Sequence, residues 1–133
     1  MSFADHLQSR LYQLALKSIQ FCRTLPRTAE GMEWAGQLRR ASTAASANYR
    51  AARRGRSRNE WRAKLGVVIE ELDEADHWLS IIGDAELRNP PQDLITECRQ
   101  LRAILAKSRA TSRRKHPERP PERKKRQRRK PSG

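Results

Sequence analysis

Apolar residues recur at alternating steps of three and four residues in four separate segments, and this spacing constrains the fold more than any other feature of the chain. Residues with this spacing share one face of an α-helix. The segments cover about residues 5–23, 28–53, 57–83 and 91–110. None of them alternates convincingly as a β-strand does. Four amphipathic helices with short connections predict an all-α, antiparallel up-down four-helix bundle.

Turn and capping signals mark the boundaries between these segments. Pro26 ends the first helix, because the residue before a proline avoids the helical conformation. Ser57, with Glu60 three residues later, forms a capping box that starts the third helix. The pair Pro90-Pro91 separates the third helix from the fourth. The connections are therefore expected to be short.

The positive charge lies in two blocks. The chain has a net charge of +14 at pH 7. Residues 39–62 hold 8 basic and 1 acidic residue, and residues 113–133 hold 11 basic and 2 acidic residues. The second block has almost no apolar surface to bury, so we expect the bundle over residues 1–112 and a disordered basic C-terminal tail over residues 113–133. So large an excess favours a polyanionic partner.

The second segment has two faces of opposite character. At about 100° per residue, its five arginines share one arc of the helix, and the opposite arc is mostly alanine with Asn48 near its middle. Alanine lets a neighbouring helix come close. A buried amide without a partner costs about 1–3 kcal/mol, so we expect Asn48 to bond to Glu71 or Glu74. The residues that we interpret as structural and polar are Gln37, Asn48, Glu71, Glu74 and Trp78.

The arginine face continues across the connection into the third segment and predicts a basic patch at one end of the bundle. The planar guanidinium group suits phosphate oxygens, although a solvated surface or a subunit contact would show the same pattern. Tyr49 lies on the buried arc and the other aromatic residues are assigned to apolar stripes, so no base-stacking platform is expected. The candidate nucleic-acid contacts are Arg39, Arg40, Arg50, Arg53, Arg54, Arg56, Arg58 and Arg62 in the patch, and Lys124, Lys125, Arg126, Arg128, Arg129 and Lys130 in the tail.

Nothing in the sequence indicates an enzyme, a metal site or a cofactor. Among the acidic residues of the third segment, only Glu74 and His77 have the Glu-x-x-His spacing, and a carboxylate metal site in a bundle needs two such pairs. Cys22 and Cys98 lack metal-ligand spacing. We expect two buried, reduced thiols, with a disulfide between the first and last helices as the alternative.

The expected location is the cytoplasm, with no membrane contact. The first ten residues include an acidic side chain and no long apolar run, unlike a signal peptide. No apolar run approaches the ~20 residues that a membrane span requires.

Residues 37–82 resemble the "four helix bundle protein" family, whose founding members are encoded by intervening sequences within 23S ribosomal RNA genes. The similarity covers roughly residues 7–108 and lies in an ordered set of positions rather than in one strong motif. Ala51, Ala75 and His77 depart from the family pattern, and the basic tail is an addition to it. The matching positions are Gln37, Leu38, Arg40, Ala41, Ala47, Asn48, Tyr49, Arg50, Ala52, Ser57, Lys64, Leu65, Glu71, Glu74, Trp78 and Leu79.

The resemblance implies a ring-like homopentamer. It also implies a relation to the accessory proteins of diversity-generating retroelements, which bind a reverse transcriptase and nucleic acid. Together with the basic patch, it predicts a non-enzymatic, oligomeric nucleic-acid-binding protein, for RNA before DNA, with a reverse transcriptase as a candidate partner. The alternative is a structural bundle whose basic surface docks an acidic protein.

Overall fold

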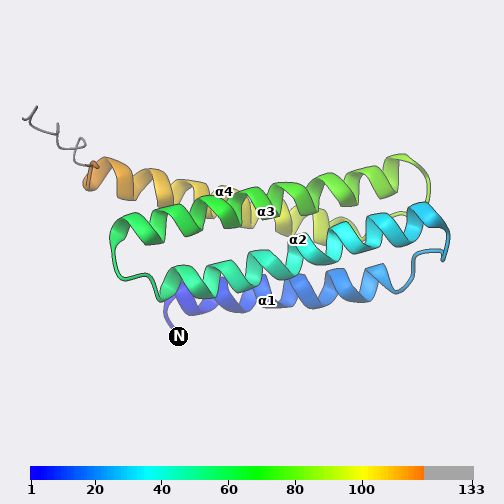
Figure 1. The fold of residues 1–133 in the computed structure, drawn as a ribbon, viewed down its shortest axis with the longest axis horizontal. Coiled ribbons are helices and arrows are strands. Elements are labelled where there is room, and N and C mark those ends of the chain that lie inside the picture. Colours follow the sequence, from blue (N-terminus) through cyan, green and yellow to red (C-terminus); the bar gives the residue numbers. More distant parts are fainter. Residues whose placement is uncertain (119–133) are drawn as a thin grey trace, which may run out of the picture.

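The computed structural model describes residues 1–118, which form four α-helices joined by short connections (Figure 1). Successive helices run in opposite directions, so the predicted all-α, up-down bundle is confirmed. Each helix lies beside the next one in the chain, and α1 and α4 share the smallest contact. The helices are α1 (Phe3–Cys22), α2 (Ala29–Arg53), α3 (Arg58–Asp84) and α4 (Gln92–Lys115).

Capping side chains explain where two of the helices begin. In α1, the Ser2 hydroxyl accepts from the Asp5 amide and the Asp5 carboxylate accepts from the Ser2 amide, each at 3.0 Å, so the helix starts at Phe3, two residues earlier than expected. In α3, the Ser57 hydroxyl accepts from the Glu60 amide at 3.1 Å, as predicted. The Glu60 carboxylate accepts from the Arg56 amide instead of the Ser57 amide, so only one half of the predicted capping box forms.

The fourth helix is longer than predicted. It continues to Lys115, so residues 113–115, which we placed in the tail, are helical. The buried guanidinium group of Arg62 donates to the carbonyl oxygens of Ser112 and His116. The Ser112 oxygen also accepts from the His116 amide at 2.9 Å, whereas the His116 oxygen lies past the last turn, where a helix leaves carbonyl groups without partners. Residues 119–133, with most of the predicted tail, lie outside the described part of the chain.

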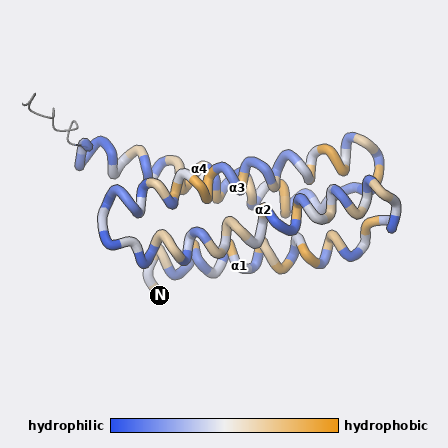
Figure 2. Tube along the Cα trace, in the orientation of Figure 1, coloured by the Kyte–Doolittle hydropathy of each residue, from blue (hydrophilic) through white to orange (hydrophobic). Residues whose placement is uncertain are grey.

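The alanine arc of α2 is buried as expected, and α2 and α3 share the largest contact in the bundle. The buried arc is wider than the spacing of about 100° per residue predicts, because Ser42 and Ser46 are buried as well. The reason is that α2 packs against both α1 and α3. Asn48 lies near the edge of this arc and is only half-buried. Figure 2 shows how apolar and polar residues alternate along all four helices.

The two cysteines are separate, buried thiols and form no disulfide. The Cys22 thiol donates to the carbonyl oxygen of Ala35 at 3.3 Å. Burial raises the pKa of Cys98 to about 12 and also raises the pKa of Cys22. In the same part of the chain, residues 1–118, none of the helices is both long and apolar enough to span a lipid bilayer.

Candidate nucleic-acid interface

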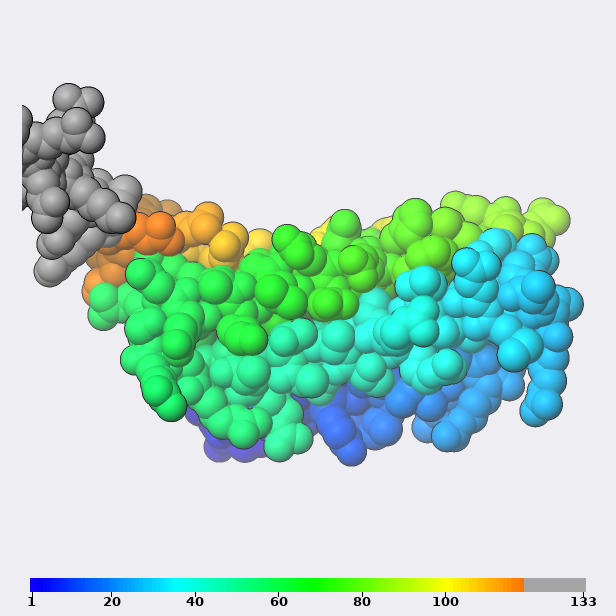
Figure 3. All heavy atoms as spheres, viewed as in Figure 1, coloured from blue at the N-terminus to red at the C-terminus, as the bar shows by residue number. Residues whose placement is uncertain are grey.

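Exposed arginines line the outside of α2 and continue through the α2–α3 connection. We call this set the arginine surface. Figure 2 shows the connection as a hydrophilic end of the bundle, and Figure 3 shows that side chains of α2 and α3 cover most of the face seen there. Its members, all predicted from the sequence, are Arg39, Arg40, Arg50, Arg53, Arg54, Arg56 and Arg58.

Arg53 differs from the rest of the arginine surface because its charge is matched. Its guanidinium group donates to the Asp5 carboxylate at 2.8 Å and to the Gln8 side-chain oxygen at 2.7 Å, both on α1. The Ser2 amide and this guanidinium group lower the pKa of Asp5 to about 2. The other six members have no carboxylate within salt-bridge distance among residues 1–118.

Arg62, which we predicted as a nucleic-acid contact, is buried instead, with 2% of its surface exposed. Its Nε donates to the Ser112 hydroxyl at 2.9 Å, and its Nη2 donates to the Ser112 carbonyl at 2.8 Å. The C-terminal end of a helix carries partial negative charge, which balances the guanidinium group without a carboxylate. Arg62 therefore holds α4 against α3 and is not part of the arginine surface.

This contact brings a second group of basic residues to the same end of the bundle. Arg113, Arg114 and Lys115 are exposed on the last turn of α4. Residues from the α2–α3 connection and from the end of α4, among them Arg58 and His116, line one shallow hollow of about 320 Å³. We did not single these three residues out, because the periodicity of the apolar residues stops before them. The first three basic residues of the second block thus lie at the same end of the bundle as the α2–α3 connection, and the acidic Glu118 also lines the hollow there.

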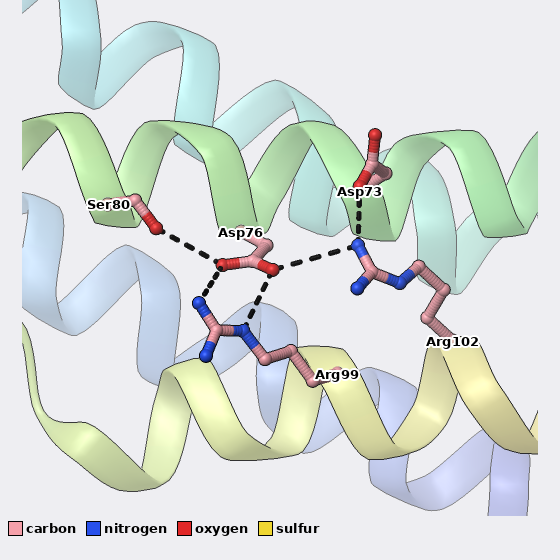
Figure 4. Close-up of polar contacts among 5 residues, drawn as sticks. All are labelled: Asp73, Asp76, Ser80, Arg99 and Arg102. Carbon is pink, nitrogen blue, oxygen red and sulfur yellow. Dashed lines mark hydrogen bonds and ion pairs between the residues drawn. The ribbon is translucent and has the colours of Figure 1, made fainter.

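Two acidic residues of α3, Asp73 and Asp76, face α4 rather than the arginine surface (Figure 4). Asp76 accepts from Arg99 Nε at 3.0 Å and from the Ser80 hydroxyl at 3.2 Å. Arg102 binds Asp73 and approaches Asp76 at 3.6 Å. These carboxylates therefore neutralise Arg99 and Arg102 of α4, and among the arginines of α2 only Arg53 has a carboxylate partner within residues 1–118. No group of three His, Cys, Asp or Glu side chains is arranged to hold a metal ion within residues 1–118.

The predicted partners of Asn48 do not bond to it in the described part of the chain, where neither Glu71 nor Glu74 forms a hydrogen bond with its amide. Glu71 is half-buried, and this burial, with repulsion from Glu74, raises its pKa. Trp78 packs against the core, and Gln37 is half-buried on α2. Because Asn48 is itself only half-buried, its amide does not need the partner that we expected.

An aromatic side chain that the sequence reasoning missed lies beside the arginine surface. Tyr12 of α1 is 51% exposed, which contradicts our assignment of the remaining aromatic residues to apolar stripes. It lines a groove between α1 and α2 of about 360 Å³, together with Arg50 and Arg54. The spacing could have revealed it, since Tyr12 is neither three nor four residues away from Leu7, Leu11 or Leu14 and so lies away from their shared face.

Comparison with known proteins supports the fold. No protein-family model matches the chain, and no curated protein matches it. The structure is similar to the crystal structure of a protein of unknown function from the S23 ribosomal protein family of Bacteroides thetaiotaomicron, with a TM-score of 0.74 and 18% sequence identity. The match covers 80% of this chain and 97% of that protein. At this identity the similarity shows that the two chains share a fold.

Proposed function

We propose that this protein is a non-enzymatic nucleic-acid-binding protein whose arginine surface contacts phosphate groups, with RNA as the preferred partner. One observation carries the proposal. Six exposed arginines of α2 and the α2–α3 connection have no carboxylate partner among residues 1–118, although the chain has 15 acidic residues. Guanidinium groups bind phosphate oxygens through paired donors.

The position of these charges supports the same proposal. The α2–α3 connection and the last turn of α4 place like charges together at one end of the molecule, and their mutual repulsion opposes folding. A polyanion that binds there relieves the repulsion and releases its own counterions. The tail residues 124–130 follow from this end of the chain and would add further phosphate contacts.

The salt dependence of binding tests the proposal. Fluorescence anisotropy with the full chain would follow a labelled RNA and a labelled DNA duplex over a series of salt concentrations. If about 6 phosphates are contacted, the slope of log K against log salt on duplex is about −5. An affinity that does not change with salt would contradict the proposal. A chain ending at residue 118 separates the contribution of the tail from that of the bundle.

A matched pair of variants tests whether the arginine surface is the site. The double substitution Arg50→Gln and Arg54→Gln removes two charges from it, and we expect weaker binding and a slope less negative by about 2. The control is Arg23→Gln with Arg27→Gln, which removes two exposed charges at the opposite end of the bundle. Equal losses in both variants would mean that net charge alone drives binding.

The protein-docking alternative gives a different result in the same assay. If the basic surface binds an acidic protein, the chain retains no RNA or DNA at physiological salt, while a pull-down captures such a partner. The homopentamer and the reverse transcriptase partner, which the family resemblance implies, remain proposals. Light scattering with and without RNA measures the size of the assembly.

A further inference from the structure

The groove between α1 and α2 combines an exposed aromatic ring with two arginines, a combination that the rest of the arginine surface lacks. Tyr12 is 51% exposed and Leu16 is 37% exposed on the α1 side, and Arg50 and Arg54 lie on the α2 side. Ala47, exposed between these walls, adds no bulk. The groove therefore offers an apolar surface large enough for a planar ring, with positive charge at its margin.

The positive charge of the groove limits the kind of ligand that can bind in it. None of the residues that line it is acidic. A neighbouring hollow of about 240 Å³ shares Tyr12 and Arg50 and contains Asp5, whose carboxylate is paired with Arg53 at 2.8 Å. An occupant must therefore be apolar and planar in one part and anionic in another, as a nucleotide is. An acidic peptide without apolar side chains would match the arginines and leave the exposed tyrosine ring uncovered.

The spacing of the two arginines also fits an extended strand. Arg50 lies on the last turn of α2 and Arg54 is its C-cap residue, about 6 Å further along the helix axis. Their guanidinium groups thus provide donors along a strand rather than at one point. In a duplex the bases are stacked on one another and cannot lie on a protein side chain, whereas an unpaired base can.

We propose that the α1–α2 groove binds an unpaired nucleotide, with its base stacked on the ring of Tyr12 and its backbone phosphates on Arg50 and Arg54. This inference rests on the proposed function and narrows it from nucleic acid in general to single-stranded segments. Stacking on an aromatic side chain accepts any base, so the preference is for unpaired strands rather than for a sequence.

The test separates stacking from charge. Two probes of equal length and charge are used with the full chain, a 12-nucleotide thymidine oligomer and the same backbone with abasic sites. We expect the wild-type protein to bind the thymidine oligomer about tenfold more tightly than the abasic one. Tyr12→Leu should bind both equally, and Tyr12→Phe should keep the preference. Phe3→Leu, which removes another exposed aromatic ring of α1, is the matched control and should also keep it.

The possible failures are distinguishable. If Tyr12→Leu keeps the full preference for the thymidine oligomer, the stacking inference is overturned and phosphate binding by the arginine surface stands. If the wild-type protein binds neither probe at low salt, the proposed function and this inference are both overturned. If Tyr12→Leu lowers the size of the assembly in light scattering and weakens both probes equally, the groove is a contact between copies of the chain, which also overturns the inference. Circular dichroism of each variant verifies the helical fold.

Discussion

Two arginines in the middle of α4 and the arginines of α2 carry the same charged group into different surroundings. On α4, Arg99 and Arg102 lie against Asp76 and Asp73 of α3, so their charges are matched between two packed helices (Figure 4). On α2, the arginine surface has one matched member, Arg53, and its remaining members face solvent. Arginine content alone therefore does not distinguish the two surfaces, whereas the presence or absence of a nearby carboxylate among residues 1–118 does.

The difference arises from the side of α3 on which its acidic residues lie. We expected Glu71 and Glu74 to turn toward α2 and bond to Asn48. In the structure it is Asp73 and Asp76 that form contacts, and they turn toward α4. α3 thus has carboxylates for α4 on one side and packs against the alanine arc of α2 on the other.

The largest effect on stability is expected at Asp76. Asp76→Asn removes a carboxylate that is 12% exposed and that both Arg99 and Arg102 contact. We expect the free energy of unfolding to fall by about 2 kcal/mol, because hydrogen bonds to a charged, largely buried group are stronger than neutral ones. Denaturation with urea, followed by circular dichroism, measures the change.

Asp73→Asn is the matched control for this prediction. Asp73 lies one turn away on the same helix and binds the same Arg102, but it is 71% exposed. An exposed ion pair contributes about 0–1 kcal/mol. Equal losses from the two substitutions would show that the network at Asp76 is no more structural than a surface pair.

A smaller loss is expected when Arg62 is replaced. Arg62→Met keeps the apolar part of the side chain but removes the donor to the Ser112 hydroxyl and to the carbonyl oxygens of Ser112 and His116, so we expect a loss of about 1–2 kcal/mol. Arg58→Met, one turn earlier and exposed, should change stability by less than about 0.5 kcal/mol. Hydrogen exchange adds a local readout, since only Arg62→Met should speed exchange in residues 112–116. Unchanged exchange there would contradict the role of Arg62.

The ion pair between Asp5 and Arg53 should make the stability of the protein depend on pH. Its pKa is about 2 in the folded chain, below its ordinary value of 3.8. A carboxyl group whose pKa is lowered by folding stabilises the protein above its unfolded pKa, and this contribution is lost as the pH falls through the folded value. We therefore expect the melting temperatures of the wild-type protein and Asp5→Asn to differ at pH 6 and to converge between pH 4 and pH 2. A difference that stays the same from pH 6 to pH 2 would contradict this role of the Asp5 carboxylate.

The fold could be predicted from the sequence because it depends on local patterns. The spacing of Leu7, Leu11 and Leu14 is visible in the chain itself, and so are Pro26 and the cap at Ser57. The surroundings of a long charged side chain depend on which helices become neighbours, and local patterns in the sequence do not contain this information.

The exposure of the arginine surface was predicted for six of its members, which have no carboxylate partner among residues 1–118. Their role in binding nucleic acid remains a proposal.

Arg62 shows why the remainder of the site could not be predicted. It continues the arginine series of the sequence, yet it turns inward, because the end of α4, 50 residues further on, supplies acceptors for it. The same long-range contact carries Arg113 and Arg114 to the end of the bundle where Arg58 lies. Tyr12 is the opposite case, since its exposure follows from the spacing and was overlooked.

The smallest effect on stability should come from the arginine surface itself. Arg50→Gln with Arg54→Gln removes two exposed charges that have no carboxylate partner among residues 1–118, so the free energy of unfolding should change by less than about 0.5 kcal/mol. Relief of repulsion between like charges favours a small gain over a loss. Urea denaturation of this variant and of Asp76→Asn compares the loss of unfolding free energy at the unmatched arginines with the loss at the matched ones. A loss as large as that of Asp76→Asn would mean that these arginines hold the bundle together, and it would remove the main reason for assigning them to phosphate binding.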